Sequence, residues 1–158
     1  MTTKATINMA FLGCGNATRK HSKTLAKRPV ERFYASRSGD RASEYNQRFG
    51  GAGWFASYED AIADPRIDAI LVATPPDTHL ELTLAALRAG KHAIIEKPPF
   101  LRSSDFAQVR EASAAGGVRA YVAENYFYRP LLGCLRELLA EDAIVAAVKD
   151  YKAKKTGA

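Results

Sequence analysis

Short apolar runs alternate with amphipathic stretches along most of the chain, and this alternation is the main sequence evidence for its fold. The apolar runs predict strands at residues 6–12, 30–36, 54–56, 69–73, 93–96 and 119–123. The run Ile70-Leu71-Val72-Ala73 contains no polar side chain. Such a run is typical of a strand that is buried on both faces of a sheet.

Helical periodicity and capping signals fill the segments between these strands. One helix is predicted after Asp40 as its cap, and a second after Ser57 and Asp60, which nearly form a capping box. A third is predicted along the stripe of Leu80, Leu84 and Leu87, which ends at Gly90. Two more are predicted from Ser103 or Ser104 to Gly116-Gly117 and after Pro130. Helical crossovers between buried strands make those strands parallel. We therefore expect an α/β fold with a doubly wound, mainly parallel Rossmann-type sheet and helices on both faces.

Composition places the chain among globular proteins. Of its 158 residues, 47% are hydrophobic and 25% are charged, which argues against a disordered or fibrous chain. No apolar run approaches the roughly 18 to 20 residues that a membrane-spanning helix needs, so we expect no membrane association. The two cysteines, Cys14 and Cys134, are too few for a disulfide framework, and this favours a reducing, cytoplasmic location.

Positive charge is concentrated in the first third of the chain. Residues 1–57 hold ten Lys or Arg and three Asp or Glu, although the net charge of the whole chain is only +6. A basic segment of this kind favours a phosphate-bearing ligand. Nucleic acid is not expected, because no aromatic-rich basic motif accompanies the charge.

A glycine-containing turn, Gly13-Cys14-Gly15-Asn16-Ala17-Thr18, directly follows the first predicted strand and opens a helix. Gly13 allows a tight turn, and Gly15 lets the backbone approach a pyrophosphate at the N-terminus of the helix, where Asn16 and Ala17 stand. Thr18 occupies the position of the third glycine of the usual fingerprint and adds a β-branched side chain to a close packing site. The turn favours dinucleotide binding over a plain strand-to-helix connection.

The end of the second predicted strand bears on the choice of cofactor. An NAD site usually has Asp or Glu about 20 residues after the glycines, whereas this strand ends in Ser36-Arg37. Arg37 is expected to lie over the adenine and donate to a 2′-phosphate, with Arg41 as a second donor one helical turn later. We therefore expect NADP, with NAD still possible. The alternative is that both arginines merely solvate the start of a helix.

Two later loops follow the fourth and fifth predicted strands, and ligands of open α/β sheets bind at such ends. In the first loop, which begins at Thr74, the paired Pro75 and Pro76 are expected to form a rigid turn that flanks the ribose or nicotinamide. His79 either contacts the cofactor or caps the helix that it begins. In the second loop, Glu96 and Lys97 precede a proline, and the Lys97–Pro98 bond is a candidate for the cis form. The ammonium of Lys97 either faces a cleft or pairs with Glu96. Lys97 is the candidate catalytic residue, since in a cleft it can donate to a substrate oxygen during hydride transfer.

Several ordered motifs resemble the glucose–fructose oxidoreductase/inositol dehydrogenase (Gfo/Idh/MocA) family. They are Gly13-Cys14-Gly15-Asn16, Ala73-Thr74-Pro75-Pro76-Asp77-Thr78-His79, Ala89-Gly90-Lys91-His92, Glu96-Lys97-Pro98 and the segment 121–130. The resemblance implies a dinucleotide-binding domain that precedes a substrate domain. It also implies that Lys97 orients substrate and nicotinamide and that Asn125 and Tyr126 line the cleft below the nicotinamide. Phe127 departs from the family, many members of which have Arg there.

The length of the chain limits the function that this resemblance implies. Family members continue for about as many residues again, and their second half supplies the Asp and His for proton transfer, whereas neither His21 nor His92 is placed as that base. We expect residues 1–142 to be the dinucleotide-binding domain. Residues 143–158, with a further strand predicted over 143–152, are expected to be the start of an absent substrate domain or a terminal arm.

The sequence thus predicts the nucleotide-binding half of an NAD(P)-dependent oxidoreductase, with NADP favoured and little activity expected of the half alone. The resemblance implies that hydride passes to or from an alcohol carbon of a sugar, inositol or related polyol. The alternative is a non-catalytic module that senses the nucleotide and acts through a protein partner. Lys97 favours the enzyme, and the short length favours the module. The fragment is expected to be a monomer or a weak dimer.

Overall fold

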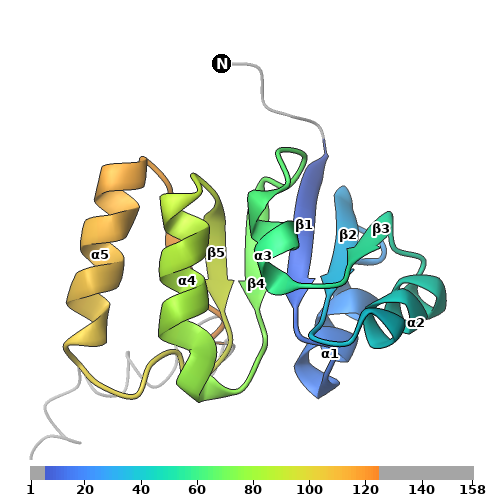
Figure 1. The fold of residues 1–158 in the computed structure, drawn as a ribbon, viewed down its shortest axis with the longest axis horizontal. Helices are drawn as coiled ribbons and strands as arrows, with labels where there is room; N and C mark the ends of the chain where they lie inside the picture. The colour runs from blue at the N-terminus through green and yellow to red at the C-terminus, as the bar shows by residue number, and fades with distance from the viewer. Residues whose placement is uncertain (1–5, 125–158) are drawn as a thin grey trace, which may run out of the picture. The chain divides into compact units, whose positions relative to one another are not determined.

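Strands and helices alternate in the computed structural model, which describes residues 6–124 (Figure 1). The elements are β1 (Ile7–Leu12), α1 (Asn16–Leu25), β2 (Val30–Ala35), α2 (Gly39–Phe49), β3 (Gly53–Phe55), α3 (Tyr58–Ala63), β4 (Ala69–Val72), the short 3₁₀ helix η1 (Pro76–Thr78), α4 (His79–Arg88), β5 (His92–Ile95), α5 (Asp105–Gly116) and β6 (Ala120–Val122). Each of the six strands predicted within residues 6–123 is present, with ends within one residue of those expected.

The six strands form one parallel sheet in the order β3-β2-β1-β4-β5-β6. This confirms the predicted Rossmann-type fold. Leu12 at the end of β1 is in register with Ala35 of β2 and Val72 of β4, so the carboxyl ends of these strands are level. The strand order reverses between β1 and β4, because β2 and β3 follow on one side of this pair and β5 and β6 on the other. Ligands bind in the crevice that this reversal leaves at the carboxyl ends of such strands.

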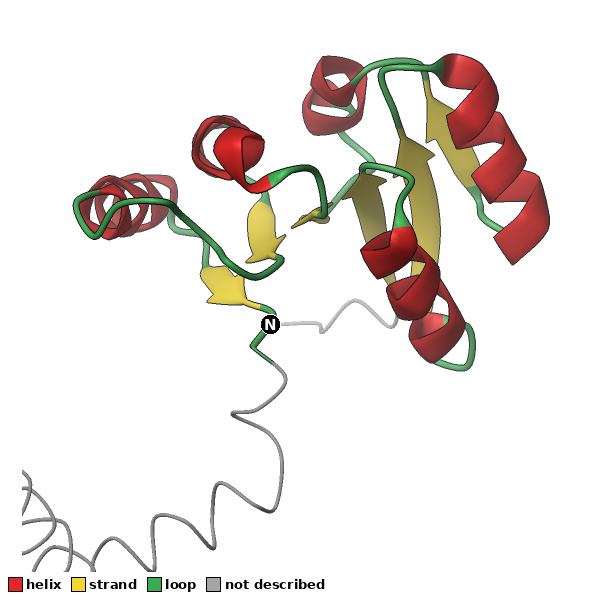
Figure 2. Cartoon of the chain, turned by 90° about the horizontal axis from the view of Figure 1, so that it is seen from below, coloured by secondary structure: helices red, strands yellow, loops and turns green. Residues whose placement is uncertain are grey.

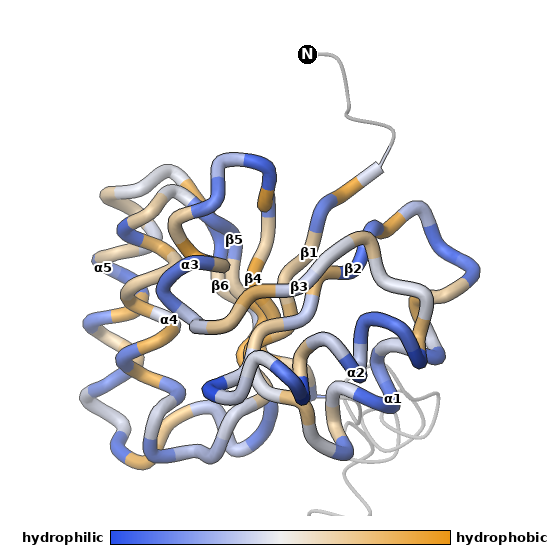
Figure 3. Tube along the Cα trace, turned by 45° about the vertical axis from the view of Figure 1, so that its right-hand side comes forward, coloured by the Kyte–Doolittle hydropathy of each residue, from blue (hydrophilic) through white to orange (hydrophobic). Residues whose placement is uncertain are grey.

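Alternate residues of the central strands enter two separate hydrophobic cores, one on each face of the sheet. Ala10 and Leu12 of β1 face the core that α3, α4 and α5 cover. Met9 and Phe11 face the core that α2 covers. Figure 2 shows helices on both sides of the strands, and Figure 3 shows hydrophobic strands at the centre with hydrophilic stretches on the helices around them. The apolar run of β4 is accordingly buried on both faces.

The helix starts agree with the capping signals at α3 and α5 and differ at α2. Ser104 is the N-cap residue of α5, as predicted. Ser57 caps α3 as predicted, because its hydroxyl oxygen accepts the backbone N–H of Asp60 at 3.0 Å. The prediction that Asp40 caps α2 is wrong, since Ser38 is the N-cap residue. Ser38 has the extended backbone that an N-cap position requires, and Asp40 already lies in the first helical turn. Its carboxylate there still favours the positive end of the helix dipole.

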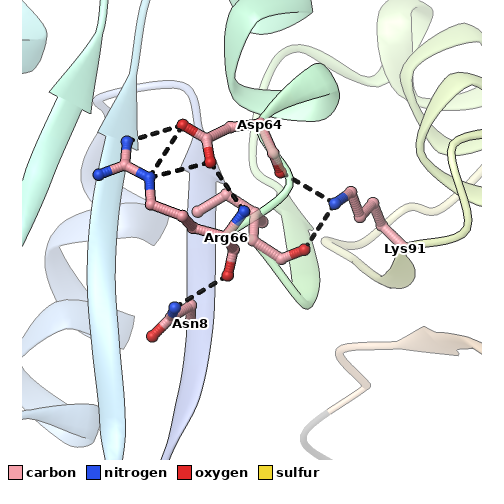
Figure 4. Close-up of polar contacts among 5 residues, drawn as sticks. Asn8, Asp64, Arg66 and Lys91 are labelled. Carbon is pink, nitrogen blue, oxygen red and sulfur yellow. Dashed lines mark hydrogen bonds and ion pairs between the residues drawn. The ribbon is translucent and has the colours of Figure 1, made fainter.

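A polar network at the amino edge of the sheet fixes the connection between α3 and β4 (Figure 4). The ammonium of Lys91 donates to the carbonyl oxygens of Asp64 at 2.9 Å and Ile67 at 2.7 Å. Arg66 pairs with the carboxylate of Asp64 at 2.7 Å and holds the pKa of that carboxyl below its usual value. The amide of Asn8 in β1 donates to the carbonyl oxygen of Arg66 at 2.8 Å. Lys91 therefore holds the fold together at the edge opposite the expected ligand.

Some predictions fall outside residues 6–124 and are not addressed by this fold. They are the helix after Pro130, the strand over residues 143–152, the domain boundary at residue 142, and the cleft residues Asn125, Tyr126 and Phe127. Within the described part of the chain, no helix combines the length and apolar character needed to cross a membrane.

Candidate functional site

A hollow of about 380 Å³ lies at the carboxyl ends of the central strands. The turns after β1, β2 and β4 contribute most of its wall, and the start of α3 completes it. Its lining residues are Gly13, Cys14, Gly15, Ser36, Arg37, Ser38, Arg41, Tyr58, Ala73, Thr74 and Pro75. Seven of the predicted cofactor residues are among them, although they come from three separate stretches of the sequence. They meet because the strands are parallel, which places the carboxyl ends of β1, β2 and β4 at the same edge of the sheet.

The two glycines of the first turn serve different purposes. Gly13 has a φ of +97°, and a Cβ atom there would lie 2.7 Å from the carbonyl oxygen of Ala73. The fold itself therefore requires glycine at position 13. Gly15 has an extended backbone with a φ of −119°, and a Cβ atom there would meet no protein atom within 4 Å. Its lack of a side chain keeps open a space next to the N-terminus of α1, where Asn16 and Ala17 begin the helix. This space suits the close approach of a phosphate.

Thr18 stands where the usual fingerprint has a third glycine, and hydrogen bonds hold its side chain in this closely packed place. Its side chain is fully buried, and its hydroxyl donates to the carbonyl oxygen of Gly13 in the same turn. The hydroxyl of Ser22 donates to the carbonyl oxygen of Thr18 at 2.7 Å, and that of Tyr34 donates to Ser22 at 3.0 Å. This departure from the usual fingerprint therefore leaves the glycine turn supported by a buried hydroxyl chain.

A basic rim borders the hollow after β2. Ser36 is buried, while Arg37 and Arg41 are exposed to solvent. The Nε of Arg41 donates to the carbonyl oxygen of Cys14 at 2.9 Å, which holds its guanidinium beside the glycine turn.

Tyr58 also lines the hollow, although the sequence analysis did not single it out. Burial raises the pKa of its hydroxyl, and the neighbouring Arg37 opposes that rise. Its position three residues after β3, close to another strand end, was the sequence signal that could have found it.

His79 joins the loops that follow β4 and β5. Only 1% of the residue is exposed. One ring nitrogen, Nε2, lies 2.8 Å from the carbonyl oxygen of Thr74, and the other, Nδ1, lies 3.1 Å from that of Pro98 and 3.2 Å from that of Pro99. The alternative that His79 caps its own helix is wrong, since both nitrogens contact carbonyl oxygens outside α4. The η1 residue Pro76 lies between Thr74 and His79 without lining the hollow.

The second loop presents Lys97 at the end of β5. The Lys97–Pro98 peptide bond is cis, as the sequence suggested. The side chain of Lys97 is exposed, and within residues 6–124 no carboxylate pairs with its ammonium. The carboxylate of Glu96 instead contacts His21 of α1 at 2.6 Å. The sequence does not indicate this contact, because His21 and Glu96 are 75 residues apart.

The thiol of Cys14 is expected to be almost inert in the folded protein. Burial raises its pKa to about 11, so the reactive thiolate at pH 8 should be about 100-fold scarcer than for an ordinary thiol. In a Cys134→Ser background, a chromogenic disulfide reagent should label Cys14 at least about 100-fold more slowly before denaturation than after it. Labelling of the native protein at the rate of a free thiol would contradict this.

The described residues offer no grouping of three or more His, Cys, Asp or Glu side chains that could hold a metal ion. The donors that line the hollow include the guanidinium groups of Arg37 and Arg41 and several hydroxyl groups, and the N-terminus of α1 beside it presents backbone N–H groups. Such donors fit the phosphates of a dinucleotide. The open space at Gly15 and the hollow beside it are consistent with that group.

Comparison with known proteins agrees with this geometry. Residues 7–124 match the model of the GFO_IDH_MocA family, described as "Oxidoreductase family, NAD-binding Rossmann fold". Oxidoreductase P35 of Formosa agariphila is 30% identical over 141 residues, which cover 87% of this chain and 44% of that protein. The chain therefore spans less than half the length of this relative.

Two solved structures with bound nucleotide are also similar. KijD10, a 3-ketoreductase from Actinomadura kijaniata in complex with NADP and TDP-benzene, is 27% identical with a TM-score of 0.79, over 86% of this chain and 42% of that one. Levoglucosan dehydrogenase in complex with NADH and levoglucosan is 27% identical with a TM-score of 0.70, over 77% of this chain and 35% of that one. The chain thus belongs to the Gfo/Idh/MocA oxidoreductase family and contains its NAD-binding Rossmann domain.

Proposed function

We propose that the chain binds a nicotinamide dinucleotide, with NADP preferred, as the nucleotide-binding half of an oxidoreductase. The reaction transfers hydride to or from an alcohol carbon of a sugar, inositol or related polyol. The observation that carries the proposal is the hollow at the strand ends, where the open space at Gly15 meets the basic rim of Arg37 and Arg41. The half alone supplies little turnover.

Each part of the hollow has a role in this proposal. The backbone at Gly15, Asn16 and Ala17 binds the pyrophosphate at the N-terminus of α1. Ser36, Arg37 and Arg41 bind the adenosine ribose and its 2′-phosphate.

The loops after β4 and β5 serve the nicotinamide. The first lines the hollow, and His79 joins the second to it. Thr74, Pro75 and Pro76 flank the ribose of the nicotinamide, and His79 keeps their loop in place. Glu96, directly after β5, completes this end of the site within residues 6–124. The bound nicotinamide supplies the hydride chemistry. Lys97 donates a hydrogen bond to the reacting oxygen of the substrate and so orients it.

The preference for NADP rests on the absence of an acidic residue after β2. A carboxylate there would accept hydrogen bonds from the ribose hydroxyls of NAD and would repel a 2′-phosphate. Ser36 and Arg37 offer donors instead, and Arg41 is held at the same rim by its contact with Cys14. The similar structures contain NADP in one case and NADH in the other, so the argument depends on this chain's own residues.

Arg37→Asp is expected to weaken NADPH binding by about tenfold or more while leaving NADH affinity equal or improved. The substitution removes a donor to the 2′-phosphate and adds an acceptor for the ribose hydroxyls. Calorimetric titration of the purified chain with NADPH and, separately, NADH measures both affinities.

Arg88→Asp is the matched control for Arg37→Asp. It makes the same change of charge on an exposed residue in the last turn of α4, and it should leave the ratio of the two affinities unchanged. Equal affinity of the unaltered chain for NADPH and NADH would contradict the NADP preference. Binding of neither nucleotide would contradict the proposed function itself.

A non-catalytic nucleotide sensor is the second candidate, and it would use the same hollow at the strand ends. The two candidates differ in turnover. The chain is mixed with a panel of polyols and NADP, and separately with keto sugars and NADPH. A change in nicotinamide absorbance above background would favour the enzyme. Tight binding without any such turnover would favour a sensor that acts through a protein partner.

Compartment and assembly complete the proposal. Two cysteines in 158 residues fit a reducing compartment such as the cytoplasm. We propose that this chain by itself is a monomer or a weak dimer, and light scattering after size-exclusion chromatography measures that state. A stable tetramer would contradict it.

A further inference from the structure

The carboxylate of Glu96 is held on both of its oxygens. Oε1 lies 2.6 Å from the Nε2 of His21 in α1. Oε2 accepts the backbone N–H of Lys97 at 3.1 Å. Glu96 therefore links the helix that begins at the glycine turn to the backbone of the candidate catalytic lysine. The backbone N–H of Glu96 also donates to the carbonyl oxygen of Val72 at 2.9 Å, which fixes the start of the loop against β4.

The same loop is held on its other side by His79, through the carbonyl oxygens of Pro98 and Pro99. Lys97 thus lies between two anchored points, while its own ammonium pairs with no carboxylate in residues 6–124. An arrangement that fixes the backbone of a lysine and leaves its ammonium available suits contact with a ligand. If Glu96 were not engaged by His21, its carboxylate would be free to turn and release the Lys97 amide.

We propose that His21 and Glu96 form a positioning pair that sets Lys97 beside the nicotinamide. This inference rests on the proposed function. His21 touches neither cofactor nor substrate and acts through Glu96. The side chains of the pair are 30% and 18% exposed, and partly exposed pairs of this kind add little to folding stability. Loss of the pair should therefore appear in the contacts of the Lys97 loop more than in the stability of the fold.

The test compares NADPH with 2′-phospho-ADP-ribose, which is the same molecule without the nicotinamide. Both ligands use the glycine turn and the basic rim, but only NADPH reaches the Lys97 loop. The ratio of their affinities therefore reports the nicotinamide end alone. His21→Leu is expected to reduce this ratio by roughly five- to tenfold, with 2′-phospho-ADP-ribose bound within about twofold of normal. The fluorescence gain of bound NADPH should fall in parallel.

Four further variants complete the experiment. His21→Gln keeps a donor and should restore at least about half of the lost affinity ratio. Glu96→Ala should act like His21→Leu, and the double variant should be no worse than either single one, since the residues act through one contact. His92→Leu is the matched control: His92 is an exposed histidine at the far end of β5 that accepts the backbone N–H of Arg119. It should leave both affinities unchanged.

The outcomes separate the inference from the proposed function. An equal loss of affinity for both ligands in the His21 and Glu96 variants would show that the pair supports only the helix, and would overturn the inference. An unchanged ratio would also overturn it. Failure of the unaltered chain to bind either ligand would overturn the proposed function and the inference with it. If His21→Leu does not fold, His21→Gln and Glu96→Ala still decide the question.

Discussion

Gly13→Ala is expected to lower the free energy of unfolding by about 3 kcal/mol, whereas Gly15→Ala, two residues along the same turn, should change it by less than about 1 kcal/mol. Position 13 requires a positive φ, and its new Cβ would overlap the carbonyl oxygen of Ala73. That oxygen belongs to backbone at the end of β4, which cannot move without disturbing the sheet. Position 15 has neither restriction.

Urea unfolding followed by far-UV circular dichroism measures both variants, and the midpoint at unchanged slope gives the difference in stability. Gly15→Ala also tests function, because it removes open space without a clash inside the protein. It should weaken NADPH binding by at least about tenfold if a pyrophosphate approaches this backbone. Equal stability of the two variants would contradict the assigned geometry. Unimpaired NADPH binding by a folded Gly15→Ala chain would argue against the pyrophosphate site.

The fold could be predicted from sequence because its main signals are local. Buried parallel strands are continuous apolar runs, as in β4, and the segments between them show helical periodicity and caps. Once the strands are known to be parallel and connected by helices, topology places every strand's carboxyl end on one edge. Gly15, Arg37 and Thr74 could therefore be predicted to meet, although each lies in a different loop.

The parts that could not be predicted depend on side chains that meet across the fold. His21 and Glu96 are separated by 75 residues, and no periodicity or spacing connects them. Thr18 looked like a steric problem because sequence does not show that its hydroxyl can reach the Gly13 carbonyl. His79 stood at a helix start, where capping is the usual local role. Its actual partners lie in another loop and are backbone atoms, which leave no signal in the amino-acid sequence.

His79→Leu is expected to lower the free energy of unfolding by about 3 kcal/mol, even though leucine is similar in size and apolar. The buried ring contacts the carbonyl oxygen of Thr74 on one side and those of Pro98 and Pro99 on the other. Leucine fills the space but donates to none of them. The loops after β4 and β5 would then lose the side chain that joins them. Chemical denaturation followed by circular dichroism measures the loss.

The control for His79→Leu is His92→Leu, in which an exposed histidine loses one contact with a backbone N–H. Exposed groups recover such contacts from water, so its unfolding free energy should fall by less than about 1 kcal/mol. His79→Asn keeps one donating group and should lie between the two. If His79→Leu were as stable as His92→Leu, the ring would be only a space-filling side chain. Lys97 would then depend on Glu96 for its position, because the link from its loop to the end of β4 would contribute nothing to stability.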